Sequence, residues 1–500
     1  MEFLDHLAIG LETALSLHNL LYAFAGCLLG TLIGVLPGLG PLATIAMLLP
    51  FTYGLPPVGA LIMLAGIYYG AAYGGSTTAI LVNLPGETSS VVTVIDGHQM
   101  ARKGKAGAAL AAAAIGSFFA GCVGVLMLAL FAAPLTRFAF KFGPAEYFSL
   151  MAVGLVGAVS LASGSVVKSI GMIVFGLLLG LVGIDVASGV TRFTFGFPEL
   201  WEGIDFIVVA VGIFAFSEIV GSLEQREHRK AYTSEITTLW PTREDIRRMT
   251  PAILRGSSIG AFVGILPGAG LSLASFFAYS LERKVSRRPD EFGHGAIEGV
   301  AGPESANNAA AQTAFIPTLT LGIPGSATMA LMLGAMIIHN IQPGPQVMTS
   351  NPDLFWGLIV SMWIGNLMLV ILNLPLIGIW VQLLKVPYRV LYPAILMFCC
   401  IGVYSVSYST FDLFMAAGFG VLGYLFHKLA CEPAPLMLGF VLGPMLEENF
   451  RRALVLSDGD FSVFVTRPIS LVLLLIAVAL VVFSVLPSLK KQRAVVFTEE

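Results

Sequence analysis

The chain has 500 residues, of which 56% are hydrophobic and only 11% charged. Soluble domains carry charge on about a quarter of their residues, so this composition excludes a soluble protein and indicates an integral membrane protein. A formal charge of -3 leaves no basic excess, which excludes a nucleic acid as partner. The 55 glycines and 27 prolines are too many for smooth spanning helices and predict broken helices and close helix packing.

The N-terminal segment, Met1–His6, lacks the basic region of a cleavable signal, so we expect the first apolar segment to be retained. The cysteines lie in apolar runs without metal-ligand spacing, which predicts free thiols. No phosphate-binding loop of the form GxxxxGK[ST] occurs, so the chain carries no ATP site of this type.

Apolar segments long enough to cross a bilayer recur along the chain. They lie at 18–35, 106–134, 146–163, 167–184, 204–221, 354–380, 391–406, 412–428 and 468–487. Glycine and proline interrupt the apolar stretches 36–95 and 256–345, which we interpret as broken or re-entrant helices. The predicted fold is an all-α polytopic membrane protein of about 12–14 membrane segments.

Two strings of glycine and proline occur twice. GVLPGLG at 34–40 is echoed by GILPGAG at 264–270, and LPG at 84–86 is echoed by IPG at 323–325. Two matches in the same order indicate two homologous halves. We therefore predict a first membrane repeat over 1–222, a charged cytoplasmic linker over 223–255 and a second membrane repeat over 256–500.

The basic residues predict that the second repeat is inverted. An odd number of crossings per half inverts the second half, as in many secondary transporters. The loop at 54–57 is uncharged while its counterpart at 283–288 is basic, and the basic loop at 96–105 has a counterpart at 340–353 without Lys or Arg. Under the positive-inside rule, this exchange marks opposite orientations.

Seven crossings per half, with the N-terminus outside, place Arg192 outside and Arg451, Arg452 and Arg467 inside. The same count leaves the basic tail at 490–493 outside, which conflicts with the positive-inside rule. A further crossing near 434–446 would remove that conflict.

Neutral polar residues gather at the interrupted segments. Backbone groups freed at a helix break are tolerated at membrane depth when they line a wet cavity, and half-helix N-termini suit an anion. The expected substrate-binding residues are Ser76, Thr77, Asn83, Pro85, Gly86, Asn307, Asn308, Thr318, Pro324, Gly325 and Ser326. The alternative is that the small residues only let helices touch and the hydroxyls bond to their own backbone.

Buried acids and freed carbonyls are candidates for ion coupling. An intramembrane carboxylate is costly, which makes Glu87 and Glu304 candidates for relaying a proton or binding a cation, together with the break glycines Gly38 and Gly268. We expect any Na⁺ to lie near Asn307 and Asn308. The alternative places both acids at helix ends as local caps. No other cofactor is expected.

Several of these strings occur together in one known family. The chain resembles the large permease subunit of the bacterial tripartite tricarboxylate transporters in its segments 68–87, 96–101, 303–309, 321–326, 342–345 and 443–452. The resemblance implies a secondary active importer, in the bacterial inner membrane, of carboxylates such as citrate or other di- and tricarboxylates. It also implies a Na⁺ or proton gradient as the energy source and two partners, a periplasmic solute-binding protein and a small membrane subunit.

The leading hypothesis is a carrier with alternating access, with elevator movement expected by analogy alone. An anion channel is the alternative, because duplicated re-entrant segments also line pores. An intramembrane enzyme is less favoured, since neither HExxH nor GxSxG occurs.

Overall fold

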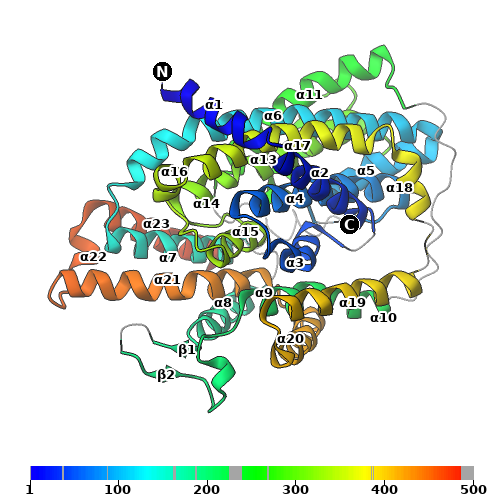
Figure 1. The fold of residues 1–500 in the computed structure, drawn as a ribbon. Coiled ribbons are helices and arrows are strands. Elements are labelled where there is room, and N and C mark those ends of the chain that lie inside the picture. The colour runs from blue at the N-terminus through cyan, green and yellow to red at the C-terminus, as the bar shows by residue number, and fades with distance from the viewer. Residues whose placement is uncertain are drawn as a thin grey trace.

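The computed structural model describes residues 2–36, 39–86, 88–161, 165–185, 188–224, 239–266, 270–384, 386 and 388–485. Figure 1 shows a bundle that is almost entirely helical, with a short antiparallel hairpin in which Gly183 pairs with Arg192. The all-α prediction is confirmed.

The elements of the first half are α1 Glu2–Ala14, α2 Leu17–Gly34, α3 Pro41–Thr52, α4 Pro57–Val82, η1 Thr88–Ser90, α5 Val91–Met100, η2 Ala101–Lys105, α6 Ala106–Ala139, α7 Pro144–Leu161, α8 Val166–Gly180, β1 Gly183–Ile184, β2 Thr191–Arg192, η3 Pro198–Leu200, α9 Phe206–Ala210, η4 Val211–Phe216 and α10 Ser217–Glu224. Those of the second half are α11 Arg243–Val263, α12 Gly270–Val285, η5 Pro289–Glu291, α13 Glu298–Thr313, α14 Phe315–Leu321, α15 Ala327–Ile338, α16 Gln346–Ser350, α17 Pro352–Asn373, α18 Ile377–Leu383, α19 Tyr388–Ser407, α20 Thr410–Lys428, α21 Ala434–Leu456, α22 Val463–Thr466 and α23 Pro468–Val485.

Helices suited to a bilayer recur along the described chain. Five helical stretches are long and apolar enough to span a membrane, namely α2, α4, the continuous run Val91–Ala139, α17 and α20. Shorter apolar helices coincide with the other predicted spans, among them α7, α8, α19 and α23. The prediction of a polytopic membrane protein is confirmed.

Glycines let α2 lie directly on α4. A Cβ atom added at Gly26, Gly30 or Gly34 would stand 2.2–2.4 Å from the carbonyl oxygens of Met63, Ile67 and Ala71, respectively. Since real Cβ atoms do not approach so closely, only glycine permits this contact. The partner positions rise together, so α2 and α4 run parallel.

The same ladder recurs in the second half between α11 and α13. A Cβ at Gly256 or Gly260 would stand 2.2 or 2.1 Å from the carbonyl oxygen of Gly302 or Ala306, respectively. Gly256 and Gly260 follow Gly26 and Gly30 by the displacement that separates the two GxLPGxG strings. The paired helices α2–α4 and α11–α13 are therefore structural counterparts.

Two long helices, α6 and α17, each pack against the helix pair of the other half. In Figure 1, α6 and α17 lie side by side along the upper edge of the bundle. The first half's α6 packs against α11 and α13 of the second half, and the second half's α17 packs against α2 and α4.

The helices α4 and α13 run in opposite directions. Gly116 of α6 lies against Ser305, and Gly124 lies against Gln312, so α6 runs parallel to α13. Ser76 of α4 donates to Glu304 of α13. Four residues later, Ile80 lies against Gly97 together with Val300, which precedes Glu304 by four residues. Because the partner positions run in opposite directions, α4 is antiparallel to α13 and hence to α6.

The predicted placement of Arg192 and Arg451 on opposite sides of the membrane was wrong. Arg192 and Arg451 contact the same oxygen of Glu447, at 2.8 and 2.6 Å, so they lie on one side of the bundle. Arg467 likewise contacts Glu146, at the start of α7, at 3.2 Å. The crossing count had placed Arg192 outside and Arg451 inside.

A long helix lies where the sequence offered a further crossing. Residues 434–456 form α21, 23 residues that run beside α8, with Gly176 against Leu436 and Gly180 against Phe440. A bilayer crossing by α21 would put Arg451, Arg452 and Arg467 on the side of Arg192, although α21 is not one of the five stretches that are long and apolar enough to span a membrane. With that crossing, the basic-residue count predicts an inside C-terminus, in keeping with the positive-inside rule.

The predicted linker over 223–255 includes residues 225–238, which lie outside the described residues. Its later part is helical, since α11 begins at Arg243, where Thr242 and Asp245 form a capping box. Arg255, at the end of the predicted linker, is paired within the helical bundle and donates to both oxygens of the buried Glu282 at 2.7 and 2.6 Å.

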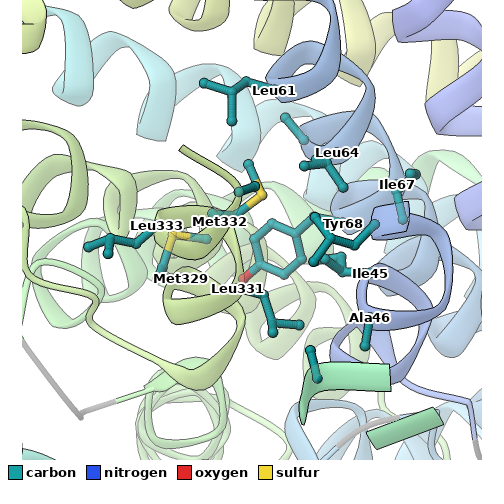
Figure 2. Packing of buried hydrophobic residues seen from close by; sticks show 14 of the residues in the cluster. Ile45, Ala46, Leu61, Leu64, Ile67, Tyr68, Met329, Leu331, Met332 and Leu333 are labelled. Atoms are coloured by element: carbon teal, nitrogen blue, oxygen red, sulfur yellow. The ribbon is translucent and has the colours of Figure 1, made fainter. Parts of the chain in front are cut away.

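A buried apolar cluster joins the two halves. Figure 2 shows the ring of Tyr68 on α4 among Met329 and Met332 of α15 and Ile45 of α3. Tyr68 is 1% exposed. The half-helix α15, which follows the second helix break, is therefore held against the first half.

Candidate functional site

A buried carboxylate lies at the centre of the bundle. Glu304 on α13 is 1% exposed, and its carboxylate accepts hydrogen bonds from the hydroxyls of Ser76 at 2.8 Å, Thr93, and Ser117 at 3.5 Å. These hydroxyls come from α4, α5 and α6. A buried carboxylate is costly unless it is hydrogen-bonded, and here α4, α5 and α6 supply the donors for the carboxylate on α13.

Asn308 extends the cluster by one helical turn. Its Nδ2 donates to Ser117 Oγ at 2.7 Å and to the carbonyl oxygen of Glu304 at 3.1 Å. Its Oδ1 is buried and has no hydrogen-bond partner among the described residues. A buried acceptor without a donor is costly, so this oxygen is a candidate ligand atom.

A small cavity adjoins the carboxylate. Its volume is about 20 Å³, and its lining residues are Tyr73, Ser76, Thr77, Leu110, Ala113, Ala114, Ser117, Glu304, Asn373 and Leu374. A water molecule needs roughly 10–15 Å³. The space suits one water or one bare ion and is far too small for a tricarboxylate.

The first helix break follows α4. Asn83 ends the helix in the left-handed conformation, with φ 62°, which Asn tolerates better than most residues. Gly86 then turns back onto α4, where an added Cβ would lie 2.6 Å from Gly75 Cα. Pro85 lies between them, and the short helix α5 follows. Thr77 donates to the carbonyl oxygen of Tyr73 at 3.2 Å, as the backbone-bonding alternative predicts.

The second break follows α14 and has the same form. Gly322 occupies the left-handed conformation, with φ 71°, at the position that corresponds to Asn83. Thr318 donates to the carbonyl oxygens of Ala314 at 2.9 Å and Ile323 at 3.3 Å. Ser326 caps α15 by accepting from the backbone N–H of Met329. These two hydroxyls shape the break.

The predicted residues therefore fall into separate groups. Ser76, Thr77, Glu304 and Asn308 gather at the cavity or beside it. Those at the two breaks are Asn83, Pro85, Gly86, Thr318, Pro324, Gly325 and Ser326. Asn307 is buried on α13. Glu87, Gly38 and Gly268 lie outside the described residues. Ligand binding by any of them stays a prediction.

Sequence reasoning missed several residues of the cluster. Thr93, Ser117, Tyr73 and Asn373 contact Glu304 or line the cavity. Ser117 follows an alanine-rich run and Asn373 ends an apolar helix, so neither has a local signal. A polar residue inside an otherwise apolar span is the only clue that was available.

Asp96 was also missed, although it belongs to a string that carries the resemblance. It is fully buried, and its Oδ1 accepts from the backbone N–H groups of Gly293, Gly295 and Ala296 at 2.7–2.9 Å. Tyr279 donates to its Oδ2 at 2.9 Å. Asp96 thereby fastens α5 of the first half to the loop that leads into α13.

Ion pairs surround the start of α13. Arg248 donates to both oxygens of Glu298, at 2.8 and 2.7 Å, and to Glu291 at 2.6 Å. The hydrogen bond from Arg248 to Glu298 raises the pKa of Arg248. Burial alone would raise the pKa of Glu291, but the hydrogen bond and charge of Arg248 and the charge of Arg288 hold it below its ordinary value.

No metal-binding group of three or more His, Cys, Asp or Glu residues occurs in the described chain. All five cysteines are free thiols, which confirms that prediction. The fold and the buried cluster together define a polytopic all-α membrane protein with two broken helices at corresponding positions and an acidic site between its halves.

Comparison with known proteins gives the family. Residues 20–438 match the tripartite tricarboxylate transporter TctA family. Because the match covers most of the chain, the protein belongs to this family, whose members are transport proteins. The resemblance seen in the sequence is confirmed.

Two relatives from Agrobacterium vitis were found. The chain is 59% identical over 500 residues, the full length of both, to a protein described as an uncharacterized 52.8 kDa protein in TAR-I ttuC' 3'region. It is 59% identical over 241 residues, 48% of this chain and all of the relative, to an uncharacterized protein in TAR-II ttuC' 3'region. No solved structure matches.

Proposed function

We propose that the chain is the permease of a binding-protein-dependent, secondary active transport system that imports carboxylates such as citrate or other di- and tricarboxylates. Membership of the tricarboxylate transporter family supports this substrate class. The observation that carries the mechanism is the pair of helix breaks at corresponding positions, Asn83 and Gly322, each followed by a half-helix. Such paired breaks mark substrate sites in secondary transporters.

The half-helices provide suitable groups for an anion. Helix α5 starts after the first break and α15 after the second, and a helix N-terminus presents free N–H groups and a positive dipole end. In the described state, Ser326 satisfies only one N–H group of α15. The break residues Gly86 and Gly325 allow close backbone approach by the substrate carboxylates.

An inverted repeat would give the carrier two exchangeable states. The counterparts α4 and α13 run antiparallel, and α6 and α17 each pack on the opposite half. We infer an inverted repeat with alternating access, in which an elevator movement shifts the breaks against the remaining helices. The small volume of the central cavity fits this mechanism, because the substrate then needs a different arrangement of the breaks.

The partners and location follow from the same proposal. A periplasmic solute-binding protein delivers the carboxylate, a small membrane subunit completes the complex, and the complex lies in the bacterial inner membrane. A Na⁺ or proton gradient supplies the energy.

Counterflow in proteoliposomes that contain both partner subunits tests the transport class. Preloaded unlabelled citrate, or a related di- or tricarboxylate, is expected to drive saturable uptake of the labelled compound. Steady anion conductance without saturation would favour the channel, and chemical conversion of the carboxylate would favour the enzyme.

Asn307→Ala tests the site. The variant is expected to lose uptake at least about tenfold while it inserts normally, because a buried amide in α13 is lost beside the acidic cluster. Near-normal uptake would remove Asn307 from the site. Asn366→Ala, which removes a buried amide of α17 outside the cavity lining, is measured in parallel and is expected to leave uptake near normal.

A further inference from the structure

We propose that the cavity beside Glu304 is a Na⁺ site built by both halves of the chain. The first half contributes Tyr73 and Ser76 of α4 and Ser117 of α6, and the second half contributes Glu304 of α13 and Asn373 of α17. This site is separate from the two helix breaks. Its role in coupling rests on the proposed function, whereas its affinity for Na⁺ does not.

The chemistry of the lining is that of an alkali cation site. The polar side chains at the cavity offer carboxylate, hydroxyl and amide oxygens, which hard cations prefer. Tyr73 and Asn373 are each 5% exposed. The Tyr73 hydroxyl and Asn373 Oδ1 have no hydrogen-bond partner among the described residues. A cation would satisfy both oxygens together, whereas a proton on Glu304 would supply only one donor.

Charge selects a monovalent ion. Glu304 carries the only carboxyl group among the lining residues, so one positive charge would neutralise its carboxylate. A divalent ion would leave an excess charge in a medium of low dielectric constant, where uncompensated charge is costly. The volume of about 20 Å³ admits an ion that has shed its hydration shell.

The site lies between α4 and α13, so Na⁺ binding affects how the two halves are held together. Ser76 lies 228 residues before Glu304 in the chain, and the two side chains meet across α4 and α13. An ion held by both helices stabilises the arrangement in which the halves are joined. Na⁺ binding therefore favours this state over any state in which α4 and α13 have separated.

Thermal unfolding of the purified full chain in detergent tests the proposal. NaCl replaces KCl at constant ionic strength, without substrate or partner subunits. The unfolding midpoint is expected to rise with the logarithm of the Na⁺ concentration, because a ligand of the folded state stabilises it by mass action. An equal midpoint in both salts, or stabilisation by acidification alone, would overturn the Na⁺ site.

Matched tyrosine variants locate the ion. Tyr73→Phe removes the buried, unpartnered hydroxyl of a lining residue and is expected to weaken Na⁺ binding by about tenfold, which corresponds to about 1.4 kcal/mol. Tyr69→Phe removes an equally buried and unpartnered hydroxyl one turn earlier, outside the cavity lining, and is expected to leave Na⁺ binding unchanged. Equal effects of the two variants would overturn the assignment.

Glu304→Gln keeps the shape of the side chain and removes its charge. The variant is expected to fold and to lose the Na⁺-dependent shift. A Na⁺ shift that survives this change would overturn the proposal. If the wild type shows the Na⁺-dependent rise of the unfolding midpoint but no carboxylate counterflow, the proposed function is contradicted and the Na⁺ site is not.

Discussion

The helix pairs α2–α4 and α11–α13 share one backbone arrangement but differ in their side chains. In both pairs, glycines spaced four residues apart bring the first helix onto the carbonyl oxygens of the second. The second helix of the first pair continues with large apolar and aromatic groups such as Tyr68. The corresponding helix of the second pair carries Glu304, Asn307 and Asn308. The two pairs thus share their packing, whereas of the helices α4 and α13 only α13 carries buried acids.

The many glycines have two structural roles. Those on the faces between the paired helices serve packing, as the structural alternative held. Those at the breaks differ, because Gly322 ends α14 in the left-handed conformation and Gly86 turns the chain back onto α4 after Asn83 has ended that helix. Glu304 of α13 accepts hydrogen bonds from hydroxyls of the first half. The residue that makes α13 differ from α4 therefore also links the two halves.

The largest expected effect comes from disrupting a glycine ladder. Gly30→Leu and Gly260→Leu are each expected to prevent folding, at a cost above about 3 kcal/mol, because the added Cβ would clash with a backbone carbonyl at 2.4 or 2.1 Å. Size-exclusion profiles of detergent extracts measure the outcome. Gly171→Leu, where no atom lies within 4 Å of an added Cβ, is the control. Folding of one ladder variant alone would show that the two pairs are not equivalent.

Asp96 tests the contact that is not duplicated. The corresponding position in the second half is Ala335, which has no carboxylate, so an equivalent set of hydrogen bonds cannot form there. Asp96→Ala leaves three backbone N–H groups without their acceptor and is expected to cost about 3 kcal/mol. Thermal unfolding measures the loss. Asp96→Asn retains an acceptor oxygen and should cost less, and equal losses would show that charge rather than hydrogen bonding holds the loop.

The left-handed residues at the breaks give a smaller effect. Asn83→Ala is expected to cost about 1 kcal/mol, since alanine disfavours a positive φ, whereas Asn83→Gly should be nearly neutral. Gly322→Ala should cost more than Asn83→Ala, because its Cβ would also lie 3.0 Å from the carbonyl oxygen of Pro343. Unfolding midpoints of the three variants check the order, and the reverse order would contradict the correspondence of the breaks.

The smallest effect concerns Glu291, which pairs with Arg288 of the basic loop at 283–288, whose counterpart at 54–57 is uncharged. The pKa of Glu291 is lower folded than unfolded, so its contribution is present above the unfolded value and is lost as pH falls through the folded value. The side chain is 41% exposed, so the effect should stay below about 1 kcal/mol. The stability difference between wild type and Glu291→Gln should shrink on acidification from neutral pH, and a constant difference would contradict the pairing.

The sequence alone determined the membrane class, most of the spans, the recurrence of the two glycine–proline strings and the positions of both breaks. These properties depend on local hydropathy and on glycine and proline, which act through the backbone next to them. Glu304 was also recognisable, because a carboxylate inside an apolar region is costly wherever it lies.

Only the tertiary structure decided which groups meet Glu304 and on which side α21 ends. Thr93 and Ser117 precede Glu304 by 211 and 187 residues, and no periodicity relates them. Whether Arg192 and Arg451 lie on one side depended on a further crossing near 434–446, which the charge count offered only as an alternative, and their shared partner Glu447 showed that they do. Contacts over such separations arise from helix packing, so their partners cannot be read from either segment by itself.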